Sequence, residues 1–172
     1  MFDDDLDDRA RTLLARCREG GLRIATAESC TGGLIAAALT AISGSSDVVE
    51  RGFVTYTNEA KHEMLGVPMA FFETVGAVSE EVARAMAAGA LEHSLADISC
   101  AVTGIAGPGG ATENKPVGLV HIAAARKGAS LAHQRHVFAG DRNAVRRQSV
   151  IVAFDMMAAL IAKGAPPANN DR

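Results

Sequence analysis

Three side chains among the first 61 residues are of the types that nucleophilic catalysis uses: Ser29, Tyr56 and Lys61. A serine hydroxyl attacks a carbonyl only when a base takes its proton, and a lysine can act as that base if burial or a nearby positive field lowers its pKa. Ser29 and Lys61 also have simpler interpretations. Ser29 can be the N-cap of a helix, and Lys61 can be a solvated lysine on a helix surface. The residues alone leave both interpretations open.

Ser29 lies in the segment 26–33, Thr-Ala-Glu-Ser-Cys-Thr-Gly-Gly, between an apolar run and an Ala-rich run. This pattern predicts a tight turn from a buried strand over 22–26 into a helix over about 30–42. The first N–H groups of a helix lack partners and carry the positive end of its dipole, so such a turn can hold a phosphate or a developing oxyanion. Gly32 and Gly33 let another group approach the backbone closely.

Two neighbours of Ser29 have polar or reactive side chains. Cys30 is a second candidate nucleophile, although a cysteine at the first turn of an apolar helix is more often a packing residue. We expect Glu28 to order the turn and not to act as the base, because its position on the strand directs it away from Ser29.

The elements that position these residues follow from hydrophobic periodicity and turn signals. We expect helices over 5–18, about 30–42, 58 to about 66, 79 to about 94 and 141 to about 163, with Asn58, Ser79 and Asp141 as caps. We expect strands over 22–26, 50–57 and 98–103, and a hairpin of 117–125 with 130–138. Phe71 and Phe72 fall in a predicted loop.

This order of elements predicts a three-layer α/β/α sandwich around a mixed, mostly parallel sheet of about five strands with one antiparallel strand. Ligands of such sheets bind beyond the carboxyl ends of the parallel strands. The segments 26–33, 56–61 and 103–110 are therefore predicted to converge on one cleft.

Composition narrows the function classes. The chain has 172 residues, 48% of them hydrophobic, which predicts one domain over 1–165 followed by a flexible tail over 166–172. Its net charge of −3 and 4% aromatic content argue against nucleic acid as a partner. The acidic N-terminus and the lack of a long apolar run favour a cytoplasmic protein without a membrane partner.

Metal and disulfide chemistry are not indicated. The three cysteines are widely separated, which fits a reducing compartment, and the five histidines have no ligand spacing. His133 and His136 are three apart on a predicted strand, so they should point to opposite faces as solvated or edge residues. We expect neither a metal nor a cofactor.

Several motifs together resemble the C-terminal domain of the CinA (competence/damage-inducible) family, over residues 8 to 162. The motifs are 26–33, Gly-Phe-Val-Thr-Tyr-Thr-Asn-Glu-Ala-Lys at 52–61, Gly-Ala-Val-Ser at 76–79, Thr-Gly-Ile-Ala-Gly-Pro-Gly-Gly at 103–110, Lys-Pro-Val-Gly at 115–118 and Phe-Ala-Gly-Asp-Arg at 138–142. The family includes nicotinamide-nucleotide amidohydrolase, so the resemblance implies an α/β/α sandwich that hydrolyses nicotinamide mononucleotide (NMN) to nicotinic acid mononucleotide and ammonia.

The resemblance assigns the nucleophile to Ser29, with Lys61 and Tyr56 as its partners. Arg142 at the start of the last helix is expected to bind the nucleotide phosphate. The residues expected near the substrate are Glu28, Cys30, Thr31, Gly32, Gly33, Thr103, Gly104, Gly107 and Arg142. The family's further N-terminal domain has no counterpart in this sequence, so its separate activity is not carried over.

A second class of function stays open, namely a non-catalytic nucleotide-binding protein with a role in competence or the damage response. Such a protein would need the glycine loops and Arg142 but no nucleophile with a lysine partner. The sequence leaves the oligomeric state open, and a homo-oligomer is one of the states that it allows.

Overall fold

A computed structural model describes residues 2–129 and 131–163 of the chain. Its helices are α1 (Asp4–Glu19), α2 (Leu34–Thr40), the short 3₁₀ helix η1 (Ser45–Asp47), α3 (Asn58–Leu65), α4 (Met69–Thr74), α5 (Glu80–Glu92) and α6 (Arg142–Lys163). Its strands are β1 (Ile24–Glu28), β2 (Val49–Val54), β3 (Ile98–Gly104), β4 (Leu119–Arg126) and β5 (Ala132–Val137). The predicted tail over 166–172 lies outside the described residues, and the single domain over 1–165 stays a prediction.

The five strands form one sheet in the order β2-β1-β3-β4-β5. β1 pairs in parallel with both β2 and β3, whereas β4 is antiparallel to its neighbours β3 and β5. Only β4 therefore runs against the other four strands. This confirms the predicted mixed sheet with one antiparallel strand.

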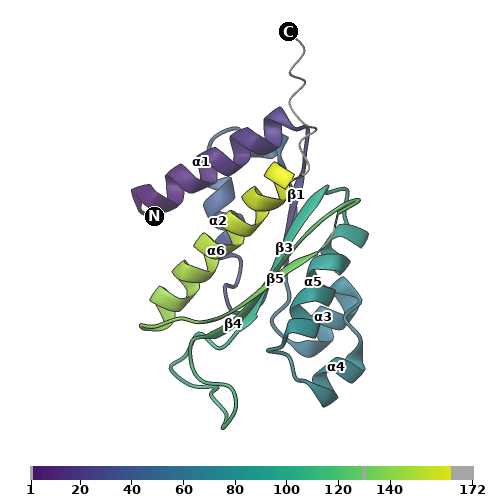
Figure 1. The fold of residues 1–172 in the computed structure, drawn as a ribbon, viewed down its shortest axis with the longest axis vertical. Coiled ribbons are helices and arrows are strands. Elements are labelled where there is room, and N and C mark those ends of the chain that lie inside the picture. The colour runs from purple at the N-terminus through teal and green to yellow at the C-terminus, as the bar shows by residue number, and fades with distance from the viewer. Residues whose placement is uncertain (1, 130, 164–172) are drawn as a thin grey trace.

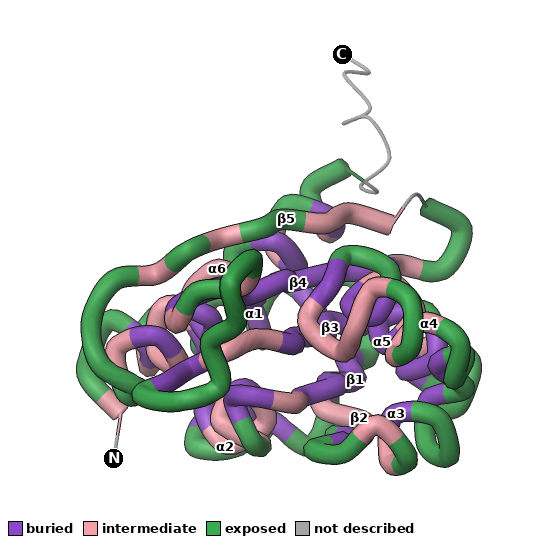
Figure 2. Tube along the Cα trace, turned by 90° about the horizontal axis from the view of Figure 1, so that it is seen from below, coloured by how far each residue is buried: buried purple, intermediate pink, exposed green. Residues whose placement is uncertain are grey.

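Helices cover both faces of the sheet. α1, α2 and α6 lie on one face, and α3, α4 and α5 lie on the other (Figure 1). Each face has its own hydrophobic core, and successive residues of β1 alternate between the two, Ile24 on the α6 side and Ala25 on the α5 side. Because helices cover both faces of the sheet at its centre, β1 is buried along its whole length, whereas every residue of the edge strand β5 is half-buried or exposed (Figure 2). The predicted α/β/α sandwich is confirmed.

The start of α2 differs from the prediction by four residues. Gly32 and Gly33 have φ angles of 59° and 95°, which a right-handed helix cannot contain. The helix therefore begins at Leu34, and Ser29 to Gly33 form an open turn directly after β1. This displaces Ser29 from the N-cap position.

Other differences are smaller. The predicted loop around Phe71 and Phe72 contains α4, a six-residue helix that is too short to give an apolar period in the sequence. The cap of α3 is Thr57, whose side chain accepts from the Ala60 N–H, and Asn58 is the first helical residue. Ser79 and Asp141 cap α5 and α6 as expected.

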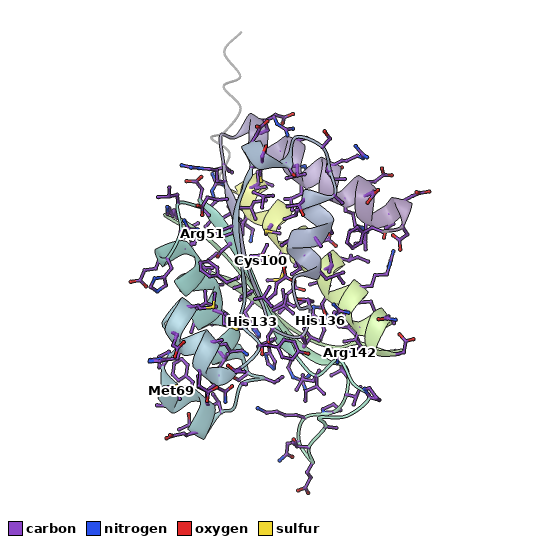
Figure 3. The ribbon with its side chains drawn as sticks, turned by 180° about the vertical axis from the view of Figure 1, so that it is seen from behind. Arg51, Met69, Cys100, His133, His136 and Arg142 are labelled. Atoms are coloured by element: carbon purple, nitrogen blue, oxygen red, sulfur yellow. The ribbon has the colours of Figure 1, made fainter. Side chains whose placement is uncertain are left out.

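The two histidines of β5 lie on opposite faces of an edge strand, as predicted. His136 stacks on Phe138, and His133 stacks on His121 of β4 and lies 3.4 Å from the Glu80 carboxylate (Figure 3). The His133 side chain is only 9% exposed, so of the two alternatives, solvated or edge, it is an edge residue.

No helix within residues 2–129 and 131–163 has the length and apolar character that crossing a bilayer requires.

Candidate active site

A cavity of about 260 Å³ lies at the carboxyl ends of β1 and β3. The three segments that were predicted to converge all contribute to its wall. Its lining includes the predicted residues Ser29, Cys30, Tyr56, Lys61, Thr103, Gly104, Gly107 and Arg142. β1 and β3 are adjacent and parallel, and their outgoing chains leave toward opposite edges of the sheet, which opens a crevice between them.

Ser29 is placed by the end of β1. Its backbone N–H donates to the carbonyl of Val102 on β3 at 2.9 Å, so the serine is fixed to the sheet and not to a helix. The N-cap residue of α2 is Gly33, which offers no side-chain hydrogen bond. The simpler interpretation of Ser29 as a helix cap was therefore wrong.

Glu28 takes over the capping of α2. Its carboxylate is fully buried and accepts the N–H groups of Gly33, Ile35 and Ala36 at 3.1, 3.0 and 2.9 Å. A buried carboxylate at the positive end of a helix dipole is stabilised by these charge-assisted bonds. Glu28 thus orders the turn, as expected, and it does not line the cavity where a substrate would contact it.

Because Glu28 occupies these N–H groups, the amino end of α2 is not free to hold an oxyanion, and that expectation needs correction. Thr31, Gly32 and Gly33 are also absent from the cavity lining, and the Gly32 N–H donates to the Ser29 carbonyl at 3.0 Å. In the part of the chain that the structure describes, the N–H groups of Cys30 and Thr31 have no backbone acceptor. They are the N–H groups of the turn that remain available.

Lys61 is one of the largest fully buried side chains, with 1% of its surface exposed. Its Nζ donates to the carbonyl of Thr55 at 2.9 Å and to that of Thr57 at 3.4 Å. Among the described residues no carboxylate forms a salt bridge with it. Burial lowers the pKa of Lys61, because removing an ammonium ion from water disfavours its charged form. The solvated interpretation of Lys61 was wrong.

Tyr56 lies between the two carbonyls that hold Lys61, but its own side chain points elsewhere. It is 58% exposed, and its hydroxyl accepts a hydrogen bond from Arg142 at 2.9 Å. The backbone on either side of Tyr56, and not its phenol, positions the amine of Lys61.

Arg142 lies at the start of α6 (Figure 3), and its guanidinium contacts two of the loops that line the cavity. Besides the bond to Tyr56, its guanidinium donates to the carbonyl of Gly107 at 3.0 Å. A second cavity of about 550 Å³ adjoins the first, because Ala106 and Arg142 line both, and it extends over the start of α6. Arg142 thus joins the two cavities.

Thr103, at the end of β3, holds another part of the cavity wall. Its hydroxyl donates to the Ala77 carbonyl at 2.8 Å and so fixes the loop before α5. Gly107 has a φ of 82°, and a Cβ there would come within 2.6 Å of Val117, so only glycine fits this loop.

Burial raises the pKa of the Cys30 thiol to about 12. The thiol is therefore neutral near pH 7, and only the thiolate is an effective nucleophile. Cys30 is thus placed as a packing residue, and Ser29 remains the candidate nucleophile.

Sequence reasoning missed several residues of the site. The additional lining residues are Asn58, Ala77, Val78, Ile105, Ala106, Gly109 and Gly110. Most of them lie inside motifs that were already noted, so the motifs gave the signal but not the individual contacts. Arg146, whose guanidinium donates to the Thr31 carbonyl at 2.8 Å, had no such signal, because it lies on α6 outside every motif.

Within the described residues, no group of three or more His, Cys, Asp or Glu side chains is arranged to hold a metal ion. The expectations of no metal and no cofactor stay predictions.

A model of the CinA C-terminal domain matches residues 6–161. A CinA-like protein of Citrifermentans bemidjiense is 51% identical over 154 residues, which make up 90% of this chain and 36% of that protein. A CinA-like protein of Mycobacterium avium is 50% identical over 160 residues, or 91% of this chain and 36% of that protein. The chain thus spans about a third of the length of these curated relatives.

Solved structures agree over almost the whole chain. The competence/damage inducible protein CihA from Agrobacterium tumefaciens superposes with a TM-score of 0.91 at 49% identity, covering 93% of this chain and 98% of that chain. A CinA superfamily protein from Escherichia coli gives a TM-score of 0.86 at 38% identity, covering 93% and 94%. Sequence and structure together show that the chain belongs to the CinA C-terminal domain family.

Proposed function

We propose that this chain is an amidohydrolase that converts NMN to nicotinic acid mononucleotide and ammonia. One observation carries the proposal: Ser29, at the end of β1, and Lys61, buried in α3, line the same cavity. A lysine whose surroundings favour the neutral amine can take a proton from a nearby serine, which is the requirement for nucleophilic attack.

The first step of the proposed reaction forms the bond between Ser29 and the substrate. The neutral amine of Lys61 takes the hydroxyl proton, and the serine oxygen attacks the carboxamide carbon. The carbonyl oxygen of the substrate then becomes an oxyanion. The N–H group of Cys30, which lines the cavity, is the donor assigned to this charge.

The second step releases ammonia. The tetrahedral intermediate collapses, the bond between carbon and the amide nitrogen breaks, and protonated Lys61 returns its proton to the leaving nitrogen. A water molecule then attacks the acyl ester with Lys61 again as base. This step frees the carboxylic acid product and restores the Ser29 hydroxyl.

The rest of the nucleotide is assigned to the adjoining cavity over the start of α6. An arginine at the start of a helix suits a phosphate, because the guanidinium charge adds to the positive end of the helix dipole. The Asp141 carboxylate caps α6 through the Ala144 N–H, so the guanidinium of Arg142 is the main group for the phosphate. Arg142 supplies that charge at the junction of the two cavities. We therefore assign the phosphate to Arg142 and the carboxamide to Ser29.

Ammonia release from NMN by the purified chain tests this function. Turnover with formation of nicotinic acid mononucleotide is the expected result, and it should survive exhaustive treatment with EDTA. A non-catalytic nucleotide-binding protein would instead bind NMN in a calorimeter and return it unchanged. Binding without turnover would therefore contradict the proposal and favour that second class.

A further inference from the structure

Arg146 connects the last helix to the turn that carries Ser29. It lies one helical turn after Arg142 on α6, so both side chains leave the same face of the helix. Its Nη2 donates to the carbonyl of Thr31 at 2.8 Å. The two residues are 115 positions apart in the sequence, so this contact joins α6 to the turn that follows β1.

The Thr31 carbonyl is a central point of the turn. It also accepts the N–H of Leu34 at 3.2 Å, which is where α2 begins. The same peptide unit carries the N–H of Gly32, which donates to the Ser29 carbonyl at 3.0 Å. A bond that fixes the Thr31 carbonyl therefore also fixes the orientation of Ser29.

This turn needs such external bonds. Its two glycines have positive φ angles and no side chains, so their own conformational preferences restrict the backbone little. Glu28 holds the N–H groups on the helix side of the turn, and Arg146 holds a carbonyl at its centre. Glu28 thus binds N–H groups of the turn and Arg146 binds a carbonyl group, so the two side chains hold opposite ends of its peptide units.

Arg146 also lacks the partners of an ordinary structural arginine. Its neighbour Arg147 forms salt bridges with Asp3 and Asp5, whereas no salt bridge of Arg146 is found among the described residues. Its Nε is buried without a hydrogen-bond partner in that part of the chain. Arg146 as a whole is half-buried, but burying its Nε without a partner costs stability, and local costs of this kind are concentrated at functional sites.

We propose that Arg146 is a positioning residue for the hydrolysis, which sets the turn so that Ser29 faces the substrate and the N–H group of Cys30 faces the oxyanion. The inference rests on the proposed function. The positive charge of Arg146 also acts on the turn. Arg142 and Arg146 both lower the pKa of the Cys30 thiol, although burial, which raises that pKa, has the larger effect.

The test compares three variants by steady-state kinetics with NMN. Arg146→Gln removes the charge and the reach to Thr31, and misplacement of the reacting groups should lower kcat by on the order of tenfold to a hundredfold with KM within about twofold. Arg146→Lys keeps the charge and should lose less. Arg147→Gln, the adjacent control, should keep the wild-type kcat. The acidic limb of the pH profile should not move in any of the three variants, because none of them changes a contact of Lys61.

A kcat for Arg146→Gln within about twofold of wild type would overturn the inference. A loss confined to KM would also overturn it, because Arg146 would then bind substrate and not position the turn. If Arg146→Gln does not fold, as judged by its thermal unfolding, Arg146→Met, which also lacks the charge and the reach to Thr31, takes its place with the same criteria.

Amide NMR separates this inference from the proposed function. Arg146→Gln should shift the resonances of Cys30, Thr31 and Gly32, and Arg147→Gln should leave them in place. If the wild-type chain does not hydrolyse NMN, the proposed function fails while these shifts still test the positioning. Unchanged resonances in Arg146→Gln would contradict the positioning whatever the activity.

Discussion

Glu28 and Ser29 are adjacent in sequence but serve opposite sides of the same turn. The Glu28 carboxylate points under α2 and accepts three of its N–H groups, while Ser29 lines the cavity and is fixed through its backbone to Val102. Gly33 and not Ser29 is the N-cap residue of α2, and Glu28 supplies the acceptors that the first N–H groups of the helix lack. The Ser29 hydroxyl is therefore not used to cap the helix.

Glu28→Gln should therefore lower the free energy of unfolding by about 2–4 kcal/mol, because an amide replaces charge-assisted acceptors and turns a donor toward the helix N–H groups. Urea unfolding measures the loss. Glu59→Gln, on the exposed first turn of α3, is the matched control and should change it by less than about 0.5 kcal/mol. Equal small effects in both variants would mean that Glu28 does not hold the turn.

The ionisation of Lys61 should determine how kcat/KM falls at low pH. Burial lowers its pKa, so the neutral amine is present above that lowered pKa, and activity should fall as the pH decreases through it. Lys61→Arg keeps a charge that does not titrate in this range and should lose on the order of a hundredfold or more. Near-full activity of Lys61→Arg would show that the residue is an electrostatic clamp and that another group deprotonates Ser29.

Arg142→Ala should weaken NMN binding far more than binding of nicotinamide riboside, which lacks the phosphate. The variant also removes the contacts to Gly107 and Tyr56, so Tyr56→Phe is the control for the lost bond to the phenol. Tyr56→Phe should affect both substrates alike. If Arg142→Ala weakened the binding of both substrates equally, Arg142 would not bind the phosphate and would serve only to connect the loops of Gly107 and Tyr56.

His121 predicts how stability depends on pH. Burial lowers its pKa to about 4, assisted by the positive charges of His133, Arg135 and Lys115. The unfolded chain therefore binds a proton that the folded chain does not between about pH 6.5 and pH 4, so stability should fall as the pH decreases through this window.

The expected loss is about 2 kcal/mol between pH 7 and pH 5, measured by urea unfolding of wild type against His121→Gln. The variant lacks the titrating group and should lose correspondingly less. A loss of the same size in both proteins would show that other groups cause the acid sensitivity.

The sequence predicted the elements that depend on periodicity and composition. The α/β/α sandwich, the mixed sheet and the convergence of three loops follow from alternating apolar runs, since parallel strands place their carboxyl ends together. The caps Ser79 and Asp141 were also predicted, because capping depends on residues close in sequence.

The details that were missed depend on contacts between distant residues. The start of α2 was misplaced because helix propensity counts Cys30 to Gly33 without knowing that Gly32 and Gly33 adopt positive φ angles. The burial of Lys61 and His133 and the reach of Arg146 to Thr31 arise only when the layers pack. Propensity and motif spacing contain no such information.

The most direct test of the account is ammonia release from NMN by Ser29→Ala beside wild type. Because Glu28 and not Ser29 caps α2, the variant should keep the wild-type Tm while hydrolysis falls to the background rate. Substantial residual turnover by a normally folded Ser29→Ala would contradict the assignment of Ser29 as the nucleophile.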